Sequence, residues 1–168
     1  MKHLDLARAN YSCVNYCDLP VPEYNIRHHV VWGCGGSDVI KTLQWQTFVF
    51  EGEVLEKFRI AAKATFDNAP TMVLMVRDLE RQNQWVPIPG KHMHESNTIQ
   101  LIHIMLDGGT KKLDSHLYMS FDREGVKKAF PEFAGYELHG IVSLGIGAER
   151  NLADYDKRMF VRAPRYCR

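Results

Sequence analysis

The sequence predicts an α+β fold, with a central mixed or antiparallel sheet flanked by helices, from three observations. Segments typical of helices alternate with segments typical of strands along the chain. The stretch TMVLMV, residues 71–76, is apolar on both faces that a strand would present, which is typical of a central strand covered on both sides. The stretch TIQLIHIML, residues 98–106, carries apolar side chains around most of a helical circumference. This pattern predicts a central helix that is deeply buried or lies at a subunit contact.

The first half of the chain is expected to contain three helices and two strands. Residues 2–9 have the pattern of a weak amphipathic helix, and a turn at 18–22 leads into a second helix at 22–33. The β-branched and aromatic run QTFVF, residues 46–50, predicts a strand. Apolar residues then recur at helical spacing through 52–66, so one stripe of this helix should face a core. The stripe consists of Val54, Leu55, Phe58, Ala61, Ala62 and Phe66.

The second half begins with a polar, irregular stretch at 77–95, which predicts a long functional loop such as a lid. Ser96 or Asn97 is expected to cap the central helix, and the glycines at 108–109 are expected to end it. The remaining expected elements are a strand at 115–120, a helix at 122–130 capped by Asp122, a strand at 136–147 and a basic, irregular tail at 148–168.

Composition and charge favour one cytoplasmic domain spanning residues 1–168. A chain of 168 residues, 45% of them hydrophobic, can bury one good core and is short for two domains. The 21 Lys and Arg against 20 Asp and Glu leave a formal net charge of +1, so no overall field favours nucleic acid. The apolar runs are shorter than the ~20 residues that span a bilayer, and the N-terminal stretch lacks the apolar core of an export signal. The four cysteines are irregularly spaced, so we expect free thiols rather than a disulfide framework.

No metal site and no nucleophilic catalytic site are expected. His92, His94 and Glu95 carry possible ligand atoms, as do His28 and His29, but zinc needs a fixed tetrahedral set and histidines in a loop are common without metal. No spacing of Ser, His and Asp, or of Cys and His, favours nucleophilic catalysis. Catalytic residues therefore stay unassigned from the sequence.

Short motifs along nearly the whole chain occur in the order found in the nitroreductase family, which the chain resembles. They are DLPVPE at 18–23, the strand–helix–strand run LQWQTFVFEGEVLEKFRIAAKATFDNAPTMVLMVRD at 43–78, HIMLDGG at 103–109, FDREGVKKAF at 121–130 and GYELHGIVSLGIG at 135–147. The resemblance implies a flavin-dependent α+β homodimer with a buried central helix. The tail at 148–168 is too polar to fold by itself, and the flank of a partner subunit is one place where it is expected to pack.

The N-terminal stretch matches only part of the phosphate-binding pattern of that family. In the family an Arg-x-Ser-x-Arg pattern holds the phosphate of flavin mononucleotide (FMN), and Ser12 falls on the serine. Asn10 and Val14 stand at the two basic positions, so the cations that a buried dianion needs are missing there. The candidate cations that remain are Arg8, Lys157 and Arg158.

The positions that would approach the flavin ring are also mixed. Gln44 stands where the family has a glutamine that can bond the pyrimidine edge of the flavin, and Thr42 replaces an asparagine. Lys112 and Asp114 replace the two glycines of a Gly-Leu-Gly turn that lets the backbone approach the ring. The resemblance implies that these side chains crowd the ring, although Lys112 also offers a cation to its electron-rich edge.

Each of these residues has a structural explanation that the sequence leaves open. Ser12 can be a turn serine that bonds its own backbone. Gln44 can be an ordinary polar residue at a strand edge, and Lys157 with Arg158 can belong to a solvated tail.

Two functions follow from the resemblance. The first is an FMN-dependent oxidoreductase that transfers electrons from NAD(P)H to a small nitroaromatic- or quinone-like acceptor, with the chemistry carried by the cofactor. The alternative is a dimer of this fold that has lost stable flavin and acts as a binding or structural protein. In the alternative, large side chains should fill the cleft between subunits, and the candidates for this are Trp45, Lys112 and His116.

Overall fold

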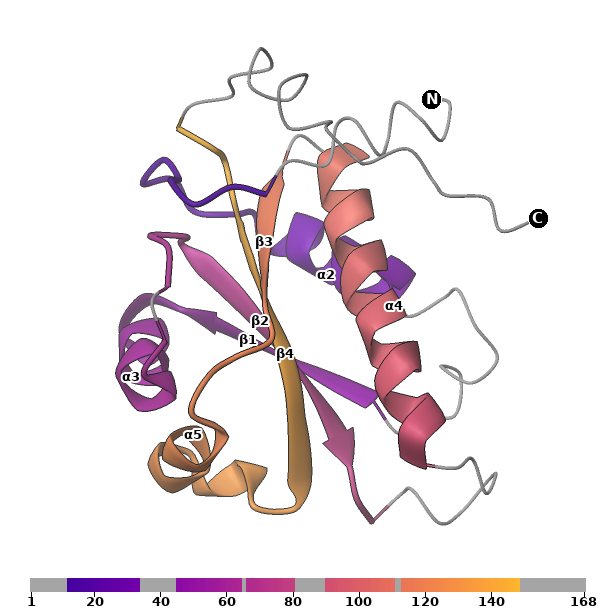
Figure 1. Cartoon of the computed structure of the whole chain (residues 1–168). Helices are drawn as coiled ribbons and strands as arrows, with labels where there is room; N and C mark the ends of the chain where they lie inside the picture. The colour runs from indigo at the N-terminus through magenta and orange to yellow at the C-terminus, as the bar shows by residue number, and fades with distance from the viewer. Residues whose placement is uncertain (1–11, 34–44, 65, 81–89, 111–112, 149–168) are drawn as a thin grey trace, which may run out of the picture.

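A four-stranded antiparallel sheet organises the chain. The computed structural model describes residues 12–33, 45–64, 66–80, 90–110 and 113–148. In chain order the elements are α2 (Glu23–Gly33), β1 (Trp45–Glu51), α3 (Gly52–Ala62), β2 (Thr71–Asp78), α4 (Gly90–Thr110), β3 (Asp114–Tyr118), α5 (Arg123–Ala129), η3 (Pro131–Phe133) and β4 (Tyr136–Gly145). The strands lie in the order β1-β2-β4-β3, and each neighbouring pair is antiparallel (Figure 1). The predicted α+β class with a central sheet is confirmed.

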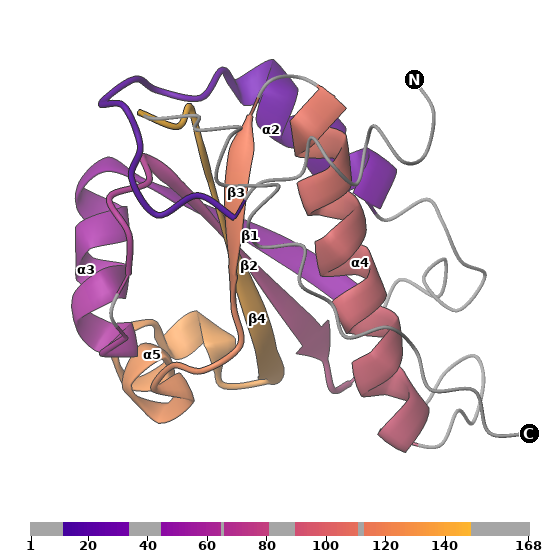
Figure 2. The same ribbon diagram turned by 45° about the horizontal axis from the view of Figure 1, so that its top comes forward.

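Helices cover both faces of this sheet. Helices α3 and α5 lie on one face, whereas α4 crosses the other face with α2 packed against it (Figures 1 and 2). Two separate apolar clusters result, because successive residues of a strand point to opposite faces. Leu74 and Ile141 belong to the cluster under α3 and α5, and Val73 and Val142 belong to the cluster under α4.

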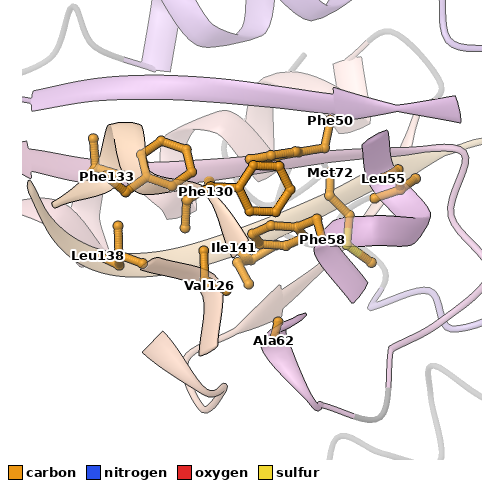
Figure 3. Packing of buried hydrophobic residues seen from close by; sticks show 12 residues of the cluster. Phe50, Leu55, Phe58, Ala62, Met72, Val126, Phe130, Phe133, Leu138 and Ile141 are labelled. Carbon is orange, nitrogen blue, oxygen red and sulfur yellow. The ribbon is translucent and has the colours of Figure 1, made fainter. Parts of the chain in front are cut away.

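The cluster under α3 and α5 is rich in aromatic rings (Figure 3). The rings of Phe50 and Phe58 stack with centroids 4.2 Å apart, and the Phe130 ring meets Phe50 edge-on at 5.6 Å. Such pairs contribute about 0.5–1.5 kcal/mol beyond the burial of their area. This cluster therefore fixes α3 and α5 on the sheet.

Strand β2 is central, as its sequence predicts. It pairs with β1 on one side and β4 on the other, and its residues from Thr71 to Val76 have no exposed surface. The stripe predicted for α3 is correct for Leu55, Phe58 and Ala62, which are buried, but wrong for Val54, which is 53% exposed. Val54 precedes Leu55 by about 100° around the helix, so it points away from the sheet.

Helix α5 begins as predicted. The Asp122 carboxylate accepts a hydrogen bond from the backbone N–H of Gly125 at 2.8 Å and lies 3.1 Å from the Lys63 ammonium. These two contacts hold the pKa of Asp122 below its usual range. The cap therefore joins the start of α5 to the end of α3.

The predicted limits of the central helix are wrong at both ends. Helix α4 starts at Gly90 and ends at Thr110, and β2 continues to Asp78, so the connection between them is much shorter than the loop predicted at 77–95. Ser and Asn lower the stability of a helix interior by less than about 1 kcal/mol each, so they can lie within a helix as well as at its cap. Gly108 lies inside the helix, and its carbonyl accepts a hydrogen bond from the backbone N–H of Leu113 at 3.0 Å.

Helix α4 is apolar on two sides, only one of which faces the sheet. Leu101 and Ile104 are fully buried against the strands, whereas Ile99 and Ile102 are 48% and 41% exposed. No helix among the described residues is long and apolar enough to cross a membrane. The side of α4 that faces away from the sheet thus exposes Ile99 and Ile102.

Candidate functional site

The segment before α2 adds a short extension to the sheet beside β3 and β4. Ser12 forms a parallel bridge with Ser115, and Tyr16 forms an antiparallel bridge with Gly147. The backbone N–H of Cys13 donates to the carbonyl of Ser115 at 3.0 Å. These backbone bonds fix Ser12, the predicted phosphate-binding serine, beside β3.

Ser12 pairs with a residue that the phosphate pattern did not include. Its Oγ lies 2.6 Å from Nδ1 of His116, and both side chains are at least partly exposed to water. When Nδ1–H of the imidazole donates to Ser12 Oγ, the hydroxyl hydrogen of Ser12 can be donated to an anion. The contact also means that Ser12 does more than cap its own turn.

Asp114, the other predicted site residue that the structure describes, faces inward. It is 5% exposed, and its Oδ2 accepts a hydrogen bond from the backbone N–H of Gly147 at 2.9 Å. Asp114 and His116 lie on the same face of β3, since they are two residues apart in a strand. The proposed contact of Asp114 with a cofactor stays a prediction.

Behind Ser12 and His116 lies a buried network of hydroxyls around one carboxylate. The hydroxyls of Tyr118 and Ser143 both donate to Oδ2 of Asp67, each at 2.7 Å. The Tyr16 hydroxyl lies 3.0 Å from Ser143 Oγ and donates to the Cys13 carbonyl at 3.0 Å. This network links the N-terminal segment and the segment before β2 to strands β3 and β4.

Burial keeps the protonated groups of this corner neutral. Burial raises the pKa of the Tyr16 hydroxyl and of the Cys13 thiol. The pKa of Tyr118 is raised by burial and by the hydrogen bond of its hydroxyl to the neighbouring Asp67 carboxylate. Each of these groups therefore keeps its proton at neutral pH. The fixed negative charges near Ser12 are carboxylates that already accept hydrogen bonds.

Asn68 holds the N-terminal segment from the opposite side. Its Oδ1 accepts from the backbone N–H of Tyr16 at 2.7 Å, and its Nδ2 donates to the Tyr16 carbonyl at 2.9 Å. The amide thus imitates the paired bonds of a neighbouring strand. Nothing in the local sequence around Asn68 signals this role, because its partner lies 52 residues away.

The other predicted site residues lie outside the described residues. They are Arg8, Asn10, Thr42, Gln44, Lys112, Lys157 and Arg158. Their assignment to cofactor binding stays a prediction.

Two of the three side chains considered as possible cleft fillers are described, and they lie on opposite faces of the sheet. Trp45 packs with the cluster under α4, with its ring 6.2 Å from that of His139. His116 lies on the other face, with its ring 4.6 Å from that of Tyr118. Within one chain Trp45 and His116 therefore do not lie together, and Lys112 is outside the described residues.

Metal and anion sites elsewhere find little support in the described part of the chain. No group of three His, Cys, Asp or Glu side chains there could hold a metal ion. His28 lies 3.1 Å from the carboxylate of Asp107, which joins α2 to α4. A surface pocket of about 620 Å³ at the start of α3 is lined by several carboxylates, including Glu51 and Glu53, so it disfavours an anionic ligand.

Comparison with known proteins gives structural matches. No protein-family model matches the chain, and no curated protein matches its sequence. A nitroreductase family protein from Clostridium difficile 630 superposes with a TM-score of 0.81 at 22% identity, covering 98% of this chain and 94% of its own. An FMN-dependent nitroreductase from Clostridium difficile R20291 gives a TM-score of 0.70 at 16% identity, covering 95% and 99%.

A further solved structure, from Desulfovibrio desulfuricans, contains FMN. It superposes with a TM-score of 0.72 at 15% identity and covers 96% of this chain and 97% of its own. Identities this low establish shared architecture rather than shared chemistry. The chain therefore has the fold of nitroreductase family proteins, as its ordered motifs predict.

Proposed function

We propose that the protein is an FMN-dependent oxidoreductase that passes electrons from NAD(P)H to a small nitroaromatic- or quinone-like acceptor. The observation that carries the proposal is the match of almost the whole chain, 98% of it, to a nitroreductase family protein. Related support comes from one match described as FMN-dependent and one described as a complex with FMN. When bound, FMN supplies the hydride and electron transfer, so the protein needs no dedicated catalytic acid.

The described donor set is compatible with the phosphate end of FMN. Ser12 and His116 present a hydroxyl and an imidazole side by side at a partly exposed corner. Asp114 lies nearby, but its carboxylate is buried and accepts from Gly147. We therefore assign Ser12 and His116 to hold the phosphate, with Arg8, Lys157 and Arg158 as the cations proposed from the sequence.

The work of the chain itself is to bind, orient and exclude water. Residues Gln44, Thr42, Lys112 and Asp114 are proposed to meet the ring, as the resemblance implies. The backbone bonds of Cys13 and Tyr16 hold the phosphate-binding corner in place before any ligand arrives. Such preorganisation reduces the cost of ordering the site on binding.

We also propose that the protein is a homodimer formed through the outer side of α4. Ile99 and Ile102 are large apolar side chains that are substantially exposed in the single chain. Burying such side chains contributes about 1.5–3 kcal/mol each when the burial is complete. A dimer of single-domain subunits, with residues 148–168 of each packed on its partner, would cover this surface.

One observation favours the alternative, a dimer that has lost stable flavin. Val14 stands at one of the missing basic positions and is 60% exposed, so this position carries no charge that could pair with a phosphate. The described segments 12–26, 113–122 and 136–148, which meet around Ser12, contain no Lys or Arg. A phosphate at this corner depends on fewer cations than in relatives that keep both arginines.

The absorption spectrum of the full-length protein separates the two functions. We expect visible flavin bands after purification, or after incubation with FMN and desalting, and bleaching of these bands on anaerobic addition of NADH or NADPH. A protein that stays colourless after incubation with excess FMN would rule out the oxidoreductase and support the alternative. Size-exclusion chromatography with light scattering on the same sample tests the dimer, and I102E should shift it towards monomer.

A further inference from the structure

We propose that His116 binds the FMN phosphate together with Ser12, in place of the arginine that the family pattern has at residue 14. This inference rests on the proposed function and makes it more specific, since it names the residue that reads the phosphate. It predicts that His116 decides how strongly the protein prefers FMN to riboflavin, which has the same ring and no phosphate.

The register of the backbone brings Ser12 and His116 together. The parallel bridge between Ser12 and Ser115 sets the two segments in register, and the next residue of β3 is His116. As a result Nδ1 of His116 lies 2.6 Å from Ser12 Oγ, although 104 residues separate them in sequence. Backbone bonds, rather than the side-chain contact alone, hold this pair together.

The contact with His116 leaves the Ser12 hydroxyl hydrogen available to a ligand. When the imidazole carries a proton on each nitrogen, Nδ1–H donates to Ser12 Oγ, and the hydroxyl hydrogen of Ser12 can be donated to another acceptor. That acceptor then lies close to the positive charge of the imidazolium. A phosphate monoester carries a charge of about −1.5 to −2 at neutral pH and has three acceptor oxygens, so it suits this position.

The described segments around Ser12 carry few groups that can be positively charged. No Lys or Arg occurs in the described segments 12–26, 113–122 and 136–148, so a positive charge next to Ser12 from these segments must come from a histidine. These segments contain two histidines. His139 is buried on the opposite face of the sheet beside Trp45, which leaves His116.

The groups that face His116 do not neutralise it by a direct ion pair in the described structure. Asp114, on the same strand, accepts from the backbone of Gly147, and Asp67 accepts from the hydroxyls of Tyr118 and Ser143. Burial raises the pKa of Cys13, Tyr16 and Tyr118, so the thiol and both phenols stay neutral at pH 7. An imidazolium here can therefore pair with an incoming anion.

The test compares the dissociation constants of FMN and riboflavin, measured by flavin fluorescence titration at pH 7 with the full-length protein. We expect the wild type to bind FMN more tightly than riboflavin. H116A should weaken FMN binding roughly tenfold to a hundredfold, the range for loss of one charged hydrogen bond, and leave riboflavin binding unchanged. H116R should keep the preference for FMN, and V14R should restore it in the H116A background.

Matched controls keep the outcome readable. N15A changes an exposed polar side chain in the same segment and should leave both dissociation constants unchanged. Circular dichroism melting checks that each variant folds, and H116R gives a second result if H116A does not.

The outcomes separate the two levels of the proposal. If H116A and wild type prefer FMN to the same degree, the phosphate is held elsewhere: the role of His116 is refuted while the oxidoreductase stands. If the wild type binds neither flavin, the oxidoreductase itself is refuted, and the role of His116 with it. If FMN and riboflavin bind the wild type equally, the protein binds flavin without reading the phosphate, which also overturns the inference.

Discussion

The two ends of strand β4 use the same face of the sheet in opposite ways. Towards one end this face presents Leu138 and Ile141 to the aromatic cluster under α3 and α5. Two residues further on it presents Ser143, whose hydroxyl joins the network of Tyr16 and Asp67. The end with Leu138 and Ile141, here called the dry end, stabilises the fold. The end with Ser143, here called the polar end, holds the segment that carries Ser12. One strand therefore supports both a core and a candidate site.

The two ends of β4 differ in what their contacts contribute to the protein. Apolar packing at the dry end is non-directional and scales with buried area. The hydrogen bonds at the polar end contribute less to stability, but they fix orientation, and leaving one partner unpaired is costly. A substitution at the dry end should therefore act on folding, and one at the polar end on both folding and the geometry of Ser12.

The largest expected effect is at the dry end. Phe58 is fully buried and stacks on Phe50, so F58A removes a ring and leaves a cavity. We expect the free energy of unfolding, measured by urea denaturation, to fall by about 3–5 kcal/mol. I60A on the same helix removes a side chain that is 77% exposed and should change it by less than about 0.5 kcal/mol. Similar losses in the two variants would contradict the packing described for α3.

A smaller effect is expected from the carboxylate at the polar end. D67A leaves the hydroxyls of Tyr118 and Ser143 without their acceptor, which should lower the free energy of unfolding by about 2 kcal/mol. The same urea titration measures it. Y118F, which removes one of the two donors and keeps the carboxylate, should cost less. If D67A is as stable as wild type, the network is not a determinant of this corner, and flavin affinity should then also be unaffected.

How much the sequence predicts depends on how local each cause is. The central place of β2 follows from its own apolar residues, and the start of α5 follows from Asp122 three residues before its partner Gly125. The sequence does not predict the start of α4 correctly, because Ser96 and Asn97 can lie inside a helix as well as at its cap.

The candidate site was less accessible to sequence reasoning. Ser12 was identified through a motif, but its contact with His116 spans 104 residues, and the contact of Tyr16 with Ser143 spans 127. No local spacing encodes pairs so distant, since strand register creates them. The charge lost at Val14 was visible in the sequence, whereas an imidazole that could replace it became visible only in three dimensions.

The most subtle expected difference between the two ends is a dependence on alkaline pH that only the polar end confers. Burial raises the pKa of Tyr16 in the folded state, whereas an unfolded tyrosine loses its proton near pH 10. The stability that the protonated Tyr16 hydroxyl contributes is fully present below pH ~10. It is lost as the pH rises towards the pKa of the folded state, because Tyr16 is then deprotonated only in the unfolded state. We expect the free energy of unfolding to fall by up to about 1.4 kcal/mol per pH unit above pH 10 for this one group. Y16F should be less stable at pH 8, through loss of the contacts with Ser143 and the Cys13 carbonyl, yet show a shallower alkaline slope. F58A, which changes only the dry end, should keep the wild-type slope, so equal slopes in wild type and Y16F would show that Tyr16 is not protected in the way its burial implies.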